Sequence, residues 1–412
     1  MTSEKQQARR VIVRIKENAS IENVLPAGPS GFGENHYKVS RLFGEATREP
    51  TILEVPQATA ERKAGFLSVN EDDEYRIMSE EQKKLRRIFT IEIPEEGEVD
   101  SFLENLNASD DVEYAQEDMI NDLLIIPNDA HWNDLWGMEK VDGHNAWDST
   151  QGDDVVVAVV DTGVDYKHPD IKKNMWSSPS GKFGYDFSDD DDDPMDYHGH
   201  GSHVAGTIAA VGHNNIGVIG LAPKAKIMAI KIFPYAYDSK IVKALRWAVD
   251  NGAKVLNNSW GPRTPRPSNP AVEDAIDYVN SKGGICVFAA GNSNDDTQRY
   301  APANKSTVIT VGATDKGDKR ASFSNWGMPV NVSAPGVDIL SLKHKTSSFK
   351  SDSGTSMACP HVAGLAALYL KQHPGATRQD IQKALEDGVD SINTDKPLGK
   401  GRINAAKTVS GK

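Results

Sequence analysis

Five short apolar runs in the second part of the chain restrict its fold more than any other feature. Within each run the apolar residues are continuous rather than alternating, which is typical of strands buried on both faces of a parallel sheet. The runs are VVVAVV at 155–160, IMAIKI at 227–232, KVLNNS at 254–259, ICVFAA at 285–290 and TVITVG at 307–312. Segments of helical length lie between and after them, at 200–211, 239–250, 271–282, 356–371 and 377–386. This order predicts an α/β domain with a doubly wound, mostly parallel sheet and helices on both faces.

The chain before residue 125 differs in composition and predicts a separate, smaller unit. It is highly charged, as in SVNEDDEYRIMSEEQKKLRR, and its strand-like runs are short. These runs are RVIVRI at 10–15, IFTIEI at 88–93 and VEYAQED at 112–118, with one helix expected at 99–107. We expect a small α+β unit here, although the pattern does not organise residues 20–87.

Charge and hydropathy restrict the partners of this protein. The formal net charge of -13 repels phosphate backbones, so we expect no nucleic-acid partner, whereas cations such as calcium are compatible with it. No run of eighteen apolar residues occurs and the N-terminus lacks an apolar run of signal-peptide length. The sequence as written therefore predicts no membrane span and a cytoplasmic protein, or a secreted one if a native signal was removed.

The two cysteines, Cys286 and Cys359, lie in apolar stretches and are expected to be buried.

Four polar residues are expected at the carboxyl edge of the predicted sheet, where active sites of such folds gather. Asp161 follows the first apolar run and Asn292 the fourth, while His200 and Ser356 begin predicted helices. Each has an ordinary structural explanation when it is taken alone, such as capping a helix or a turn. Together they supply a nucleophilic hydroxyl, a base, a carboxylate that orients the base, and an oxyanion donor. This set predicts acyl transfer by a serine.

The stretch DYHGHGSHVAGT offers a different chemistry, because it holds three histidines within six positions. His198, His200 and His203 could surround a zinc ion, and a zinc hydrolase is the alternative that this cluster suggests. That hypothesis leaves the serine, carboxylate and amide described above without a role.

The motifs that carry these residues resemble a known family. VVDTGVD, HGSHVAGT and GTSMACPHVAG look like the three signature blocks of the subtilisin-like serine proteases, or subtilases, and AAGN resembles their oxyanion-hole segment. The resemblance covers about residues 125–410. It implies a subtilisin-like fold and a serine endopeptidase made as a self-processing zymogen. Asp161, His200 and Ser356 would be the catalytic triad, and Asn292 would bind the oxyanion.

The resemblance also implies how a substrate is bound. NNSWGP is similar to the segment whose backbone pairs with the substrate as an added strand, and AAG would form the opposite wall of the primary pocket. The expected substrate-binding residues are Ser259, Trp260, Gly261, Ala289, Ala290 and Gly291.

One or two structural calcium sites are implied as well. The loop AVGHNNIGVIG resembles the strong calcium loop of the family, whose ligands here would be Asp129, Asp170, Gly212, Asn214, Ile216 and Val218. The acidic stretch YDFSDDDDDPMDYHGHG resembles a second calcium loop, with Asp186, Asp189, Asp191 and Asp193 as ligands. Calcium prefers about six to eight oxygen ligands and would neutralise these charges, so the run of aspartates favours calcium over the alternative, a solvated acidic loop.

By the same resemblance, residues 1–124 would be a propeptide and 125–412 the catalytic domain. The propeptide, of ferredoxin-like fold with an extra segment at about 20–87, would assist folding, inhibit the enzyme and be removed by cleavage between Leu124 and Ile125. Protein or peptide substrates and its own propeptide are the expected partners of a monomeric enzyme.

Other functions share some of these motifs. A maturation peptidase dedicated to one partner would contain all of them. A catalytically inactive binding protein is contradicted by the presence of all four active-site residues, and a cyclising transpeptidase would need a sizeable insertion near the cleft, which the sequence lacks.

Overall fold

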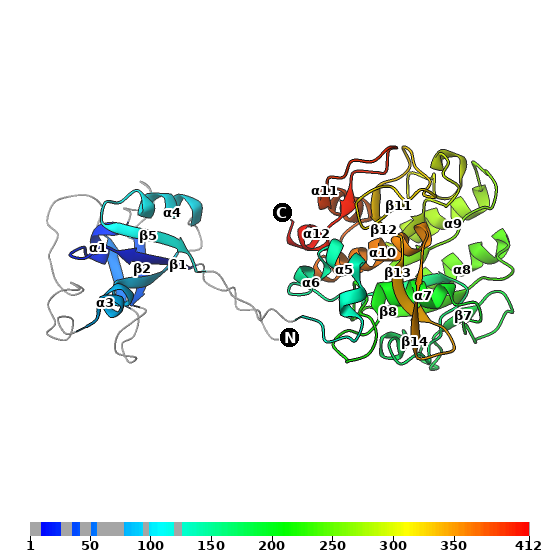
Figure 1. Cartoon of the computed structure of the whole chain (residues 1–412), viewed down its shortest axis with the longest axis horizontal. Helices are drawn as coiled ribbons and strands as arrows, with labels where there is room; N and C mark the ends of the chain where they lie inside the picture. The colour runs from blue at the N-terminus through cyan, green and yellow to red at the C-terminus, as the bar shows by residue number, and fades with distance from the viewer. Residues whose placement is uncertain are drawn as a thin grey trace. The chain divides into compact units, whose positions relative to one another are not determined.

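The computed structural model describes residues 10–25, 35–41, 51–55, 78–93, 99–118 and 126–411. It divides the chain into two compact units, residues 1–123 and 124–412, which are shown in Figure 1. The expected cleavage point between Leu124 and Ile125 lies outside the described residues. Within the described parts of the chain, no helix is both long and apolar enough to cross a bilayer.

The described part of the first unit contains an antiparallel sheet. Its strands pair in the order β3-β2-β4-β1-β5, and a buried cluster including Val13, Phe89 and Leu106 joins the sheet to its helices. The elements are β1 (Arg10–Ile15), α1 (Ile21–Val24), β2 (Asn35–Arg41), β3 (Thr51–Val55), α3 (Glu80–Arg86), β4 (Ile88–Glu92), α4 (Val99–Asn107) and β5 (Val112–Glu117).

The sequence-based elements of this unit agree closely with β1, β4, α4 and β5. The strands β2 and β3 and the helix α3 fall within residues 20–87, which the pattern did not organise. The hairpin of β2 and β3 pairs through β2 with β4, so it extends the sheet at one edge.

The second unit is built on a nine-stranded sheet. Its order is β15-β16-β12-β11-β10-β9-β6-β8-β7, and all neighbours are parallel except β15 and β16. The strands are β6 (Val156–Asp161), β7 (Gly184–Asp186), β8 (Lys226–Lys231), β9 (Val255–Asn258), β10 (Ile285–Ala289), β11 (Ile309–Thr314), β12 (Val332–Pro335), β15 (Val389–Asp390) and β16 (Arg402–Ile403). The predicted doubly wound, mostly parallel α/β fold is confirmed, because five of these strands coincide with the five apolar runs.

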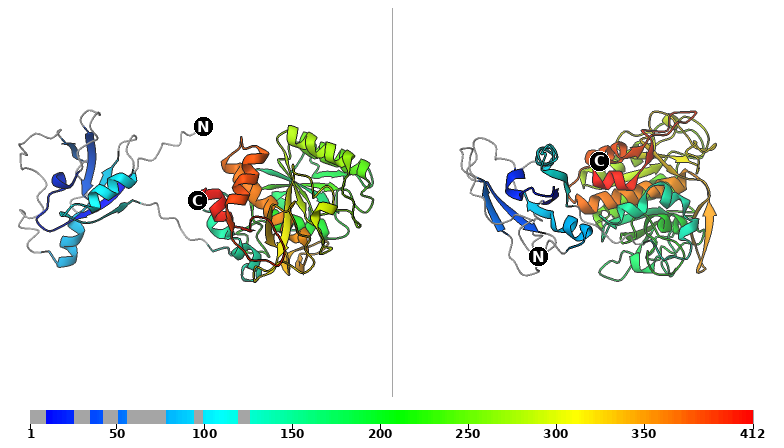
Figure 2. Two further views of the ribbon diagram at one scale, coloured as in Figure 1. Left: turned by 90° about the horizontal axis from the view of Figure 1, so that it is seen from above. Right: turned by 60° about the vertical axis from the view of Figure 1, so that its left-hand side comes forward.

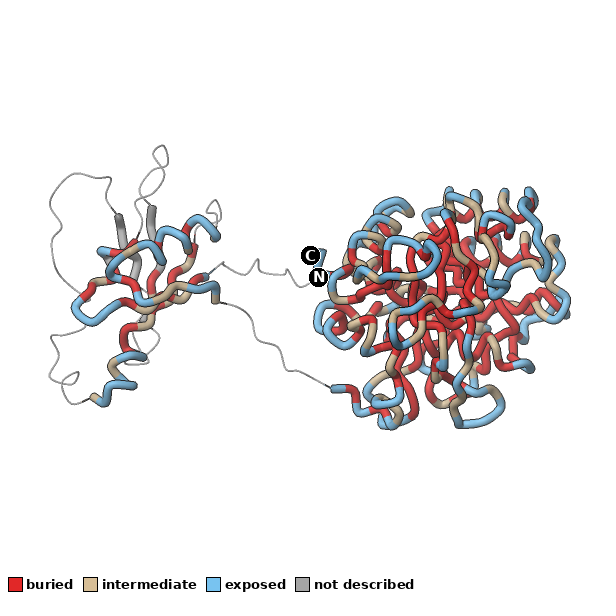
Figure 3. Tube along the Cα trace, turned by 45° about the horizontal axis from the view of Figure 1, so that its top comes forward, coloured by how far each residue is buried: buried red, intermediate tan, exposed pale blue. Residues whose placement is uncertain are grey.

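Helices cover both faces of this sheet. Along β6, Val157 and Val159 pack in one buried cluster with α7 (His200–Ala209) and α10 (Thr355–Gln372). Ala158 and Val160 pack in the other with α8 (Asp238–Asp250) and α9 (Pro270–Ser281). Both faces of the central strands are therefore buried, and Figures 2 and 3 show the helices around a buried interior. The remaining helices of this unit are α5 (Trp136–Lys140), α6 (Gly143–Ala146), α11 (Arg378–Asp387) and α12 (Ala405–Ser410), with 3-10 turns at Trp132–Asp134, Lys172–Asn174 and Thr297–Arg299.

A two-stranded hairpin lies outside the central sheet. It consists of β13 (Ile339–Lys343) and β14 (Ser348–Asp352), which pair antiparallel and lead directly into α10. The imidazole Nε2–H of His203 on α7 donates to the backbone carbonyls of Ile339 (2.9 Å) and Lys350 (3.2 Å), and these hydrogen bonds connect the hairpin to α7. The sequence did not predict this hairpin.

Candidate active site

Asp161 and His200 meet at the carboxyl edge of the sheet. Asp161 is the last residue of β6, His200 is the first of α7, and the His200 Nδ1 lies 2.7 Å from Asp161 Oδ1. The same carboxylate oxygen accepts a hydrogen bond from the Thr162 backbone N–H at 2.7 Å. Asp161 is only 1% exposed, and its contact with Nδ1 orients the imidazole.

The pKa of His200 results from opposing effects. Burial lowers it, but the charge of Asp161 and its hydrogen bond raise it, with further contributions from the charges of Asp196 and Asp352. The raising effects prevail, so the pKa lies above the ordinary value for histidine. An imidazole in this setting can accept a proton and hold it as a stabilised cation.

Ser356 lies in the first turn of α10, next to the segment that follows β9. Its hydroxyl donates to the backbone carbonyl of Ser259 at 3.0 Å, and the Ser259 hydroxyl donates to the Ser356 carbonyl at 3.0 Å. The Ser356 hydroxyl must therefore rotate before its proton can pass to His200. Loose nucleophile-to-base geometry of this kind is common in enzymes without substrate.

Asn292 presents its side-chain amide to the same region. Its carbonyl oxygen accepts hydrogen bonds at 2.8 Å from the backbone N–H and from the hydroxyl of Thr355, the residue before Ser356. This anchoring fixes the carbonyl end of the amide and leaves the NH₂ end as a donor for a ligand.

A cavity of about 190 Å³ opens beside Ser356. Five of the six expected substrate-binding residues line it, namely Trp260, Gly261, Ala289, Ala290 and Gly291. Ser259 instead holds Ser356 through the hydrogen bonds described above. Tyr300 and the three residues after it also line the cavity, and the sequence analysis did not identify them as substrate-binding residues.

The other two histidines of the cluster do not join His200 in a metal site. His203 is fully buried against the hairpin, and burial lowers its pKa to about 4. His198 is exposed, with its ring 6.4 Å from that of His200. Among the described residues no cluster of His, Cys, Asp or Glu is suited to a metal ion, so the zinc alternative loses its geometric basis.

Asp196 is a further residue of the site that the sequence did not reveal. It is fully buried and accepts five hydrogen bonds, from Thr162 Oγ1, from the backbone of His198, Gly199 and Ser202, and from Ser202 Oγ. Thr162 follows Asp161, and Ser202 lies in the first turn of α7. Asp196 therefore connects the backbone that carries Asp161 with the helix that carries His200.

The loop proposed for strong calcium binding brings buried carboxylates together. Asp129 and Asp170 are 4% and 0% exposed, and one oxygen of Asp129 is buried without a hydrogen-bond partner among the described residues. Burial raises the pKa of Asp170 to about 6, with a smaller contribution from the charge of Asp129, although hydrogen bonds from Asn214 and Val218 oppose it. An unpartnered buried carboxylate oxygen beside a second carboxylate is what an oxygen-binding cation would satisfy, so these residues fit calcium.

The second calcium loop does not have this arrangement. The ammonium of Lys231, with its side chain 7% exposed, lies 2.6 Å from Asp186 and 3.5 Å from Asp189. Asp191 accepts from the backbone of Asp193, and Asp193 accepts from the Tyr166 hydroxyl. In this geometry a lysine on the neighbouring strand supplies positive charge to the loop, and the second calcium site at these four aspartates stays a prediction.

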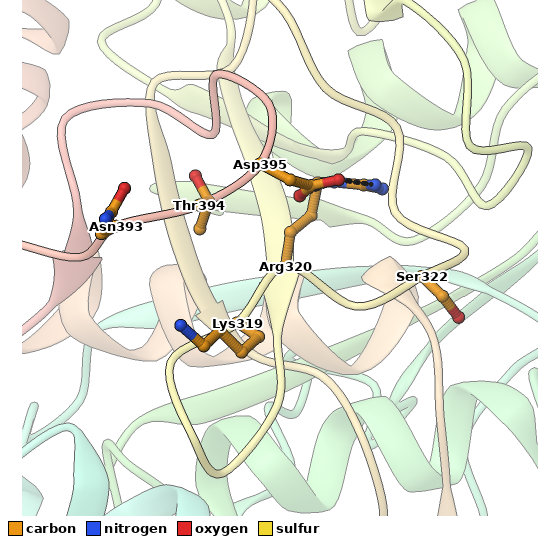
Figure 4. Close-up of a pocket in the computed structure, with 6 residues that line it drawn as sticks. All are labelled: Lys319, Arg320, Ser322, Asn393, Thr394 and Asp395. Atoms are coloured by element: carbon orange, nitrogen blue, oxygen red, sulfur yellow. Dashed lines mark hydrogen bonds and ion pairs between the residues drawn. The ribbon is translucent and has the colours of Figure 1, made fainter.

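A second, wider hollow of about 500 Å³ is lined by other residues, and among them Arg320 makes several hydrogen bonds (Figure 4). The Arg320 guanidinium contacts both carboxylate oxygens of Asp395 at 2.9 and 2.7 Å and also bonds Asn294 and the Ser324 carbonyl. Its donors are used within the protein, so this hollow is a structural junction. It is lined by Lys319, Arg320, Ser322, Asn393, Thr394 and Asp395.

Both cysteines are buried, as expected, and both are free thiols. Burial raises the pKa of Cys359, three residues after Ser356, to about 12, so this thiol stays protonated and does not compete as a nucleophile.

Comparisons with known proteins show the family of this chain. Residues 152–402 match the model of the subtilase family. Over 320 residues the chain is 40% identical to the thermophilic serine proteinase of Bacillus sp. (strain AK1), which covers 76% of this chain and 77% of that protein. It is 39% identical over 288 residues to thermitase of Thermoactinomyces vulgaris, covering 69% of this chain and 99% of thermitase. A solved protease structure from Pseudoalteromonas arctica PAMC 21717 matches with a TM-score of 0.64 and 31% identity, over 69% of this chain and 99% of that one.

The chain belongs to the subtilase family. It is a subtilisin-like serine endopeptidase, and proteins or peptides are its substrates.

Proposed function

We propose that Ser356 is the nucleophile of this endopeptidase, with His200 as its general base, Asp161 as the group that orients His200, and Asn292 as an oxyanion donor. The observation that carries the proposal is the 2.7 Å contact between Asp161 and His200 at the edge where α10 presents Ser356. The cavity beside Ser356 gives the substrate side chain a place at the same edge.

These roles combine into a balanced reaction. His200 takes the proton of the Ser356 hydroxyl as Oγ attacks the substrate carbonyl, and the developing oxyanion is stabilised by the Asn292 NH₂. The imidazolium, stabilised by Asp161, then gives its proton to the leaving nitrogen, which breaks the peptide bond and leaves an ester on Ser356. A water molecule, deprotonated by His200, hydrolyses this ester and restores the hydroxyl.

The half of the substrate that precedes the scissile bond would be held by backbone pairing and by the cavity beside Ser356. The backbone at Ser259, Trp260 and Gly261, which becomes exposed at Gly261, can pair with an extended peptide as an added strand. Ala289 and Ala290 are small, so the cavity between these segments has room for a large apolar side chain.

Calcium would be held by Asp129, Asp170 and Asn214, with the carbonyls of Gly212, Ile216 and Val218. The ion would neutralise two buried carboxylates and connect Asp129, near the start of the second unit, to the loop at residues 212–218. The support for this site is the unpartnered buried oxygen of Asp129.

We also propose that residues 1–124 are a propeptide that assists folding, inhibits the monomeric enzyme and is removed by cleavage between Leu124 and Ile125. The support is the resemblance of the first unit to subtilase propeptides and its compactness as a separate unit.

Steady-state kinetics on a peptide substrate test the catalytic roles. Ser356→Ala should lower kcat by about 10⁶-fold, the loss known from removal of a triad member in subtilisin itself. Asn292→Ala should lower kcat by about 10²–10³-fold, as the corresponding donor does in subtilisin, with little change in KM. Ser351→Ala, which changes an exposed serine five positions earlier, is the control and should remain active. Full activity of Ser356→Ala would contradict the mechanism.

A peptide library read by mass spectrometry distinguishes the two kinds of endopeptidase. Cleavage at many different sequences identifies a broad endopeptidase, and cleavage of one sequence alone identifies a dedicated maturation peptidase.

A further inference from the structure

Pro360 interrupts the backbone hydrogen bonding of α10 close to Ser356. In an α-helix each backbone N–H donates to the carbonyl four positions earlier, and the residue four positions after Ser356 is Pro360. Proline has no N–H, so the Ser356 carbonyl lacks its α-helical donor. A backbone carbonyl that is shielded from water needs a donor, and another group is therefore required at this point.

The hydroxyl of Ser259 supplies that donor. Ser259 directly follows β9 and is 4% exposed, and its Oγ donates to the Ser356 carbonyl at 3.0 Å. This bond belongs to the side chain of Ser259, whereas the Ser356 hydroxyl donates to the Ser259 backbone carbonyl. The Ser356 main chain is therefore held by a side chain that lies outside α10.

The amide of Asn257 orients the Ser259 hydroxyl. Its Nδ2 donates to Ser259 Oγ at 3.0 Å. Because that oxygen accepts from Asn257, its single proton is left to point at the Ser356 carbonyl. Side chains alternate along a strand, so Asn257 shares the face on which Val255 packs with Ala358 of α10. The three groups form one chain, from the Asn257 amide through the Ser259 hydroxyl to the Ser356 carbonyl.

The burial of Asn257 indicates that its role is not the stability of the fold. It is 0% exposed on β9, which lies between β6 and β10 in the centre of the sheet. Its Oδ1 is buried and has no hydrogen-bond partner among the described residues. A buried amide that is only partly satisfied costs free energy, which an apolar side chain of similar size would avoid. The hydrogen bond to Ser259 gives this costly residue a function.

We propose that Asn257 and the Ser259 hydroxyl are positioning residues for the nucleophile, and that they replace the hydrogen bond which Pro360 removes. The inference rests on the proposed role of Ser356. Neither group touches the reacting atoms. They hold the first turn of α10 so that Ser356 Oγ and the Asn292 amide face the same substrate carbonyl, and a displacement of about 1 Å there is enough to lower kcat by about 100-fold.

Steady-state kinetics of the full chain on one peptide substrate test the two roles, with intact mass recorded so that variants are compared in the same processing state. Ser259→Ala keeps the backbone that pairs with the substrate, so kcat should fall by about 10- to 100-fold with little change in KM. Asn257→Leu preserves the side-chain volume and should also lower kcat, although its melting temperature should not fall. Adding Asn257→Leu to Ser259→Ala should cause no further loss, because Asn257 acts only through that hydroxyl.

A matched control separates positioning from stability. The hydroxyl of Ser333 on β12 is also buried and donates to a backbone carbonyl, that of Gly401, at 2.9 Å. Ser333→Ala therefore breaks the same kind of hydrogen bond elsewhere in the sheet. It should lower the melting temperature and leave kcat unchanged.

Restoring the helical donor should rescue the loss. Pro360→Ala supplies an N–H four positions after Ser356, so in that background Ser259→Ala should change kcat by less than about twofold. Unchanged kcat in Ser259→Ala or in Asn257→Leu, or the same loss from Ser259→Ala with and without Pro360→Ala, would overturn the inference while leaving the serine mechanism intact. Failure of the mechanism has a different sign, which is hydrolysis that survives Ser356→Ala.

Discussion

The pKa of His200, and with it the strength of the base, depends on the residues that surround the imidazole. Burial alone would lower its pKa and weaken it as a base, but Asp161 compensates at 2.7 Å. The positions of Asp161, His200 and Ser356 could be predicted from the sequence, because each ends a buried strand or lies at the start of a helix. The rotation of the Ser356 hydroxyl toward Ser259 and the five hydrogen bonds of Asp196 could not, since they depend on contacts between distant segments.

The raised pKa of His200 predicts the acidic limb of the pH profile. Only neutral imidazole can accept the Ser356 proton, so activity is complete above the pKa and is lost as the pH falls through it. The midpoint of kcat/KM against pH should lie above 6.5, the ordinary value for histidine. Asp352→Asn should move the midpoint downward, whereas the control Asp274→Asn, which removes an exposed charge from α9, should not. A wild-type midpoint below 6.5 would contradict this assignment of the base.

Replacing Asp196 should damage both the site and the fold. In Asp196→Asn the NH₂ group would face the N–H and O–H donors that now point at the carboxylate, so at least one buried donor loses its acceptor, at a cost of about 1–3 kcal/mol. We expect a lower melting temperature and a kcat reduced by about tenfold or more, because His200 is displaced from its position. Asp192→Asn, an exposed neighbour in the same loop, is the control. Unchanged kinetics in Asp196→Asn would show that this network does not position the triad.

At the scale of elements, the buried strands were predictable and the pairings between them were not. Continuous apolar runs identify β6 and β8 to β11, but a short strand such as β7 carries no such run. The register that places Asp186 opposite Lys231 is absent from the sequence pattern, so the ion pair within the acidic loop could not be predicted. A register decides which charges meet, so a loop composition alone cannot distinguish a cation site from an internal ion pair.

Calcium should stabilise the enzyme through the loop at residues 212–218. If calcium binds the native state only, a free concentration about 100 times its dissociation constant adds about 2.7 kcal/mol to the free energy of unfolding. The melting temperature of Ser356→Ala, used to prevent self-digestion, should rise by several degrees, and much less when Asp170→Asn is added. The matched control Asp189→Asn alters the acidic loop that contacts Lys231 and should keep the full response. A melting temperature that is the same in chelator and in calcium would exclude the proposed site.

At the scale of the whole molecule, the chain should process itself. If residues 1–124 are a propeptide, wild-type protein should yield two fragments divided within a few residues of the bond between Leu124 and Ile125, as read by intact mass. Cleavage within one molecule is independent of protein concentration, so dilution should not change its rate. Ser356→Ala should remain whole. A fully active enzyme that retains residues 1–124 covalently would contradict the propeptide assignment.

The central claim is that one serine, Ser356, carries the hydrolysis. A fluorophosphonate, which reacts covalently with activated serines, tests it by peptide mapping of the labelled protein alongside residual activity. We expect one adduct, on Ser356, with activity lost in proportion to labelling and no adduct in Ser356→Ala or His200→Ala. An adduct on another residue, or hydrolysis that persists when Ser356 is fully labelled, would contradict the account.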